Sequence, residues 1–151
     1  MIGWNPSCWS EVLDSGWSLH PPVDPYGDGY IAHLRAELRD EGLYAKTIVT
    51  INRQADGEGD LAAFLASLAD DWRGWRGSRI WHALEHEMSV AGVHDGRGHV
   101  SLEVTLRRPN GAFADDAWSA RSVFVLEAGE EMTTLARDIE SLLAQPPGNY
   151  R

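Results

Sequence analysis

The chain has 151 residues, 43% of them hydrophobic, and a formal net charge of −10 at pH 7. This length and apolar content suffice for a buried core and argue against a disordered protein. The charge argues against nucleic acid or an anionic membrane as partner, because both require a basic protein surface.

The single cysteine, Cys8, cannot form an internal disulfide, which is typical of a reducing compartment. A membrane-spanning helix needs about 18 consecutive apolar residues, and no stretch of the sequence comes close to that length. The first residues also lack the charged and apolar regions of a secretion signal. We therefore expect one cytoplasmic domain over residues 1–151.

Residues 1–25 are rich in Trp and Pro, and they predict an irregular segment with a short strand near Gly16 to His20. The core is expected over residues 26–145. From Tyr30 to Arg39 apolar and polar residues alternate, and after a turn Leu43 to Arg53 returns as a second strand. These two segments predict a β-hairpin.

Asp60 is a good N-cap for a helix over 61–72, where apolar residues recur at helical spacing. The segment from Glu85 to Arg107 predicts a second hairpin that turns at Asp95-Gly96-Arg97-Gly98. On its second strand, the side chains of Leu102 and its alternate neighbours are expected to face the core.

Residues 121–127 predict a further strand, and its run Val123-Phe124-Val125-Leu126 is expected to be buried on both faces. A second amphipathic helix is predicted over 130–143. The elements therefore predict an α+β fold in the order ββ-α-βββ-α. We expect a two-layer sandwich, with a mostly antiparallel sheet of about six strands and both helices on one face.

The run from His82 to His86 has the spacing of an inverted zinc-protease motif, which requires a helix and a third ligand. Because the next residues predict a strand, we expect the two histidines to be about 13 Å apart, too far to share a metal. Asp56, Glu58 and Asp60 resemble the start of a calcium loop, but leucine follows where that loop requires glycine. We predict no metal site, no cofactor and no catalytic residue.

The segment from Trp72 to Arg79 interleaves aromatic residues with arginines, as single-strand nucleic-acid binders do. The net charge of −10 opposes that function. We instead expect Trp72 and Trp75 to pack under the end of the preceding helix.

Four groups of residues are specific in combination: Phe64 to Trp75, Trp81 with Leu84-Glu85, His94 to Val100, and Trp118 followed by Val125 to Glu131. They resemble an uncharacterised bacterial domain-of-unknown-function family that is common in high-GC actinobacteria. The resemblance covers about Asp24 to Leu143 and implies no established activity.

The order of the elements and the acidic entry from Tyr26 to Tyr30 more loosely resemble immunity proteins. Those proteins neutralise the contact-dependent toxins of wall-associated polymorphic systems. This resemblance implies a small, acidic, cytoplasmic protein that acts by binding rather than by catalysis.

We therefore expect a non-enzymatic acidic binding protein, most concretely an immunity-like inhibitor of a basic toxin. Its expected contacts are the acidic loop and the end of the first helix: Asp56, Glu58, Asp60, Asp70 and Asp71. The alternative is a small-ligand binder or an enzyme that uses the open sheet face. The residues of that alternative site are His33, Glu37, His99 and Glu103.

Overall fold

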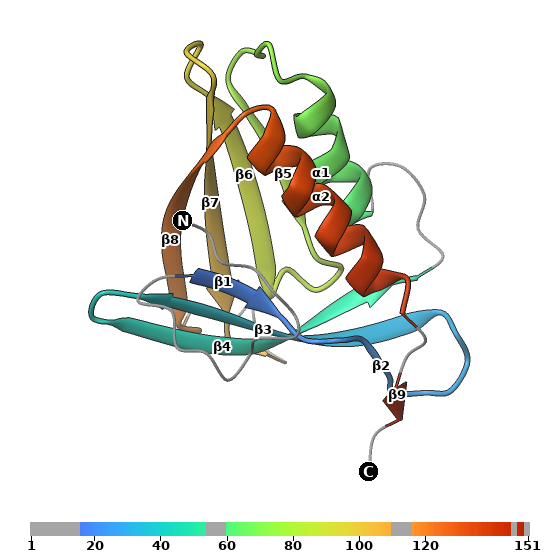
Figure 1. Ribbon diagram of the computed structural model, residues 1–151. Coiled ribbons are helices and arrows are strands. Elements are labelled where there is room, and N and C mark those ends of the chain that lie inside the picture. The colour runs from blue at the N-terminus through green and yellow to red at the C-terminus, as the bar shows by residue number, and fades with distance from the viewer. Residues whose placement is uncertain (1–15, 54–59, 110–115, 146–147, 150–151) are drawn as a thin grey trace.

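The computed structural model describes residues 16–53, 60–109, 116–145 and 148–149. In this part of the chain, two helices and nine strands occur, and the strands form two sheets (Figure 1). The α+β class predicted from the sequence is confirmed. The expectation of one sheet was wrong, because the strands divide into a five-stranded and a four-stranded sheet.

The first sheet is built around the predicted long hairpin. Its strands are β1 (Gly16–Leu19), β2 (Val23–Asp24), β3 (Ile31–Asp40), β4 (Leu43–Asn52) and β9 (Gly148–Asn149). β3 and β4 pair in unbroken antiparallel register over all ten residues. β1 and β2 pair with β3, and β9 runs parallel to β2. β1 confirms the short strand expected near Gly16 to His20, so part of the expected irregular segment belongs to this sheet.

The second sheet is an antiparallel meander. Its strands, in spatial as in chain order, are β5 (Ser78–His82), β6 (Met88–His94), β7 (His99–Arg107) and β8 (Ser119–Glu127). β6 and β7 are the predicted second hairpin, and Gly96 and Gly98 in its turn have positive φ. The sequence analysis did not predict β5.

Two helices, α1 (Leu61–Asp70) and α2 (Glu130–Leu143), lie side by side across one face of the second sheet (Figure 1). α1 ends two residues before the predicted boundary, so the side chain of Trp72 lies beyond the helix and is half exposed. α1 packs closely against Gly92 of β6. A Cβ atom at that position would lie 2.8 Å from Leu68 Cδ1.

The first sheet crosses the end of the second, as Figure 1 shows. The hydroxyl of Thr47 on β4 donates a hydrogen bond to the carbonyl of Arg107 on β7, at 2.6 Å. Glu87, only 3% exposed, accepts hydrogen bonds from the backbone N–H and the hydroxyl of Thr50. Apolar side chains from both sheets and both helices form one hydrophobic cluster.

β8 differs from its prediction. Phe124 and Leu126 are buried, but Val123 is 52% exposed and Val125 is 61% exposed. The helices cover only one face of this sheet (Figure 1). A continuous apolar run therefore occurs here in a strand that is buried on one face only.

Candidate functional site

The predicted acidic contacts do not form one group. Asp56 and Glu58 lie outside the described residues. Asp60 is the N-cap of α1 and accepts a hydrogen bond from the backbone N–H of Ala62 at 2.9 Å. Asp70 and Asp71 lie at the opposite end of this ten-residue helix, about 15 Å away by its rise.

Asp71 is already engaged within the chain. Its Oδ2 atom lies 2.6 Å from Nη1 of Arg79 on β5. Both side chains are partly exposed, so this pair contributes little to stability. Of the expected contact residues that the structure describes, Asp60 thus caps α1 and Asp71 forms an ion pair at the opposite end of that helix.

The alternative set is also divided. His33 and Glu37 lie on β3 of the first sheet, whereas His99 and Glu103 lie on β7 of the second. His99 is at the end of β7 remote from the first sheet, about 26 Å along the strand from Arg107. The expectation of a single site from these four residues was wrong, because the open faces belong to two sheets.

His99 and Glu103 have local partners of their own. Nδ1 of His99 lies 3.4 Å from Oδ2 of Asp95, and Oε1 of Glu103 lies 3.7 Å from Nη1 of Arg121. Backbone N–H groups of Arg97 and His99 hold the pKa of Asp95 below its ordinary value. These contacts stabilise the β6–β7 turn and the strand surface.

Glu37 is the centre of a polar cluster on the outer face of the first sheet. One of its carboxylate oxygens lies 3.0 Å from Nε2 of His20, and the other accepts the hydroxyl of Tyr44. Burial alone would raise the pKa of Glu37, but the bonds from Tyr44 and His20 outweigh it and hold that pKa below its ordinary value. The guanidinium of Arg39 stacks on the Tyr44 ring, 4.6 Å from its centroid.

His82 and His86 are not separated as the sequence predicted. Their rings stack with centroids 3.9 Å apart, because residues 83–87 form a turn in which His86 has a φ of 61°. Burial, and then the proximity of His82, lower the pKa of His86. Within the described ranges, no group of three His, Cys, Asp or Glu side chains is placed to hold a metal ion.

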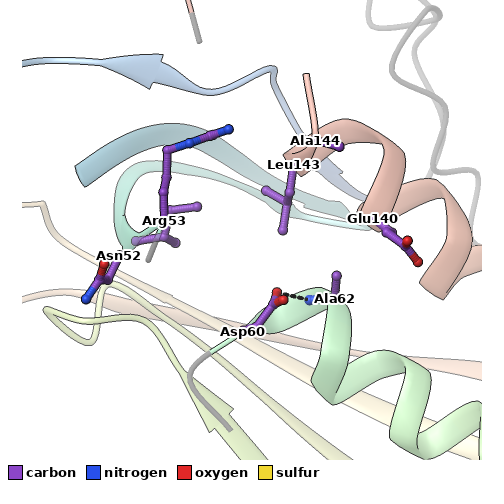
Figure 2. Close-up of a pocket in the computed structure, with 8 residues that line it drawn as sticks. Asn52, Arg53, Asp60, Ala62, Glu140, Leu143 and Ala144 are labelled. Carbon is purple, nitrogen blue, oxygen red and sulfur yellow. Dashed lines mark hydrogen bonds between the residues drawn. The ribbon is translucent and has the colours of Figure 1, made fainter. Parts of the chain in front are cut away.

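A cavity of about 230 Å³ lies where the end of β4 meets the start of α1 and the end of α2. Figure 2 shows Arg53 and Leu143 on one side of it, with Asp60 and Ala62 on the other. The Nη1 atom of Arg53 is buried and has no hydrogen-bond partner among the described residues. Of these residues the sequence analysis had singled out only Asp60, because no local pattern indicates that α2 ends beside β4.

The outer face of the second sheet carries exposed apolar side chains on either side of the central strand β7. Four residues form what we call the apolar patch, all between 44% and 63% exposed: Ile80, Val93, Val123 and Val125. The register places Val93 and Val125 in one row across the strands, and Ile80 and Val123 in the next. This patch was not predicted from the sequence.

The described chain is thus an α+β protein with two mostly antiparallel sheets, each with an outer face that the two helices leave uncovered. Residues 14–146 match the model of a family described as "Family of unknown function (DUF6228)", and the chain belongs to that family. This confirms the expected membership in a domain-of-unknown-function family. No curated protein and no solved structure matches the chain significantly. Neither helix in the described ranges is long and apolar enough to cross a membrane.

Proposed function

We propose that this chain is a non-enzymatic binding protein that docks a basic partner protein on the apolar patch. The observation that carries the proposal is the exposure of Ile80, Val93, Val123 and Val125 on neighbouring rows of one sheet face. Single exposed apolar residues are ordinary, whereas several of them on one sheet face are typical of an interaction site.

The architecture of the patch supports a protein as the occupant. Four hydrogen-bonded strands hold the β-branched side chains on a rigid surface, so little conformational entropy is lost on binding. Glu103 lies between Ala91 and Val123 in one row of the patch, and it pairs with Arg121, so its charge is compensated within the chain. Apolar side chains interspersed with paired polar groups occur commonly in protein interfaces.

The net charge supports a basic partner. At −10, the chain attracts a positively charged protein before contact and so increases the association rate. The most concrete form of the proposal is an immunity-like inhibitor of a basic toxin, in the cytoplasm of an actinobacterium. In this form the apolar patch supplies affinity, and the acids of the chain, including Asp70, supply steering.

The test compares two substitutions that add the same charge at similar volume. Val125→Asp places a carboxylate within the patch, whereas Thr134→Asp places one on the exposed surface of α2. We expect a basic protein to be captured from the native lysate by the wild type and by Thr134→Asp. Capture by Val125→Asp should be weaker by about tenfold or more, because interface anchors contribute about 2 kcal/mol or more.

Binding kinetics then test the role of charge. With the captured partner, the association rate should fall steeply as ionic strength rises, and Val125→Asp should mainly increase the dissociation rate. Equal capture by both variants would refute the patch as the docking surface. Failure of the wild type to capture any basic protein would refute the proposed function.

A further inference from the structure

We propose that the outer face of the first sheet binds the phosphate group of a small phosphate monoester, through Arg35 and Lys46. This site lies on a different sheet from the apolar patch and does not depend on the function proposed above. The inference rests on the local charge, the strand register and the hydrogen bonds of that face.

The face is basic although the chain is acidic. Arg35, Glu37 and Arg39 alternate with buried residues on β3, and Lys46 lies on the same face of β4. Three cations against one carboxylate give this surface a formal charge of +2, in a chain whose total is −10. We call Arg35, Arg39 and Lys46, with Glu37 among them, the basic face.

The register brings the cations within reach of one ligand. Lys46 is directly opposite Glu37, and Arg35 is the next outward-facing residue on β3. Diagonal neighbours of this kind are about 7–8 Å apart, which is within the reach of long side chains. Arg35 and Lys46 can therefore both contact a single tetrahedral anion.

The carboxylate that would normally neutralise these cations is engaged elsewhere. Glu37 uses one oxygen for His20 and the other for Tyr44, and Arg39 stacks on the Tyr44 ring. The side chains of Arg35 and Lys46 are exposed, and neither makes a hydrogen bond or an ion pair within the described residues. The two positive charges are thus left for a ligand.

A phosphate monoester fits this arrangement better than other anions do. It carries nearly two negative charges at neutral pH, which matches the charge of the face. The guanidinium of Arg35 can bind two of its oxygens, while the ammonium of Lys46 acts as a point charge. The ring of Tyr26 contacts His33, the outward-facing residue next to Arg35 on β3, edge-on.

A small molecule is favoured over a polyanion. The positive surface spans only a few residues, and electrostatic interactions between exposed charges are screened beyond about 8 Å at physiological salt. A nucleic acid or a long acidic segment would extend over the remaining surface, where acids predominate, and would be repelled there. One phosphate group is small enough to interact with the basic face alone.

The test is titration of the purified chain with phenyl phosphate at about pH 7.5 and low salt, followed by two-dimensional NMR and calorimetry. The changes in amide chemical shift should saturate with added ligand and should map to β3 and β4. Arg35→Gln and Lys46→Gln should each weaken binding about tenfold or more, because each removes a charge-assisted hydrogen bond. Arg137→Gln, which removes an exposed arginine from α2, is the matched control and should leave the affinity within about twofold.

Several outcomes would overturn the inference. A titration that does not saturate, or equal weakening by Arg137→Gln, would show that there is no specific site. A phosphoserine peptide or an oligonucleotide that bound at least about tenfold more tightly than phenyl phosphate would assign the face to a macromolecule instead. Circular dichroism of each variant checks that the fold is retained, which we expect because all three changes are at exposed positions.

Discussion

Gly92 is the position where the packing of α1 on the second sheet can be tested most directly. A Cβ atom there would lie 2.8 Å from Leu68 Cδ1 and 3.6 Å from Leu102 Cδ2. Overpacking of this kind costs about 1–3 kcal/mol. Replacing glycine by alanine within a strand stabilises the folded state by about 0.5–1 kcal/mol, which offsets part of this cost. We therefore expect Gly92→Ala to destabilise the chain by about 0.5–2 kcal/mol, or roughly 2–6 °C in Tm.

The assay is a double-mutant cycle. Leu68→Ala removes the atom that the new Cβ would meet, at the cost of a buried leucine, so alone it should destabilise by about 2–5 kcal/mol. In that background Gly92→Ala should become neutral or stabilising, which corresponds to a coupling of about 1–3 kcal/mol. Urea unfolding of all four proteins measures this coupling. A Gly92→Ala cost that is unchanged by Leu68→Ala would refute the argument that the helix side chain requires the glycine.

Two further predictions concern the second sheet and the polar cluster on the first. Leu102→Asp should cost several kcal/mol of stability because it places a charge in the core. Glu103→Ala on the outer face should change stability by about 0.5 kcal/mol or less. Similar urea midpoints for the two variants would contradict the assignment of these side chains to opposite faces of β7. Because the pKa of Glu37 is lowered in the folded state, its carboxylate stabilises the fold above the unfolded pKa and loses this contribution as pH falls through the folded pKa. Glu37→Gln should therefore lower Tm at neutral pH and make Tm less dependent on pH on the acid side, and parallel Tm profiles for the two proteins would contradict this role.

The sequence predicted those elements whose pattern is local and regular. The alternation from Tyr30 to Arg39 and the turn around Gly96 correctly predicted two hairpins. The N-cap Asp60 correctly predicted the start of α1. In each case residues close in sequence fix the periodicity or the backbone conformation, so no knowledge of distant contacts was needed.

The division into two sheets was not predictable in the same way. It depends on which strand edges meet, for example where the hydroxyl of Thr47 bonds to the carbonyl of Arg107, 60 residues further along the chain. The apolar run in β8 also led to a wrong prediction of burial, because valine has a high strand propensity whether or not it is buried. For Val123 and Val125, exposure follows from the helices covering only the other face.

The positions of some candidate side chains were mispredicted for a related reason. The separation of His82 from His86 was calculated for an extended chain, but the turn at residues 83–87 brings the rings into contact. The buried side chain of Glu87 bonds to Thr50 on another sheet and so anchors that turn. Likewise, both hairpins were assumed to belong to one sheet when four residues were grouped into one site: His33, Glu37, His99 and Glu103.

The pairing of β2 with β9 bears on how the chain folds. Val23 is in register with Gly148, so two strands separated by 125 positions lie side by side in parallel. During synthesis the central meander and its helices can form from contacts between neighbours in sequence, whereas this pairing waits until residue 148 has emerged. Contacts of such long range slow folding because their loop must close first. We expect β9 to be among the last strands to dock, with its amide hydrogens exchanging faster than those of the β6–β7 hairpin.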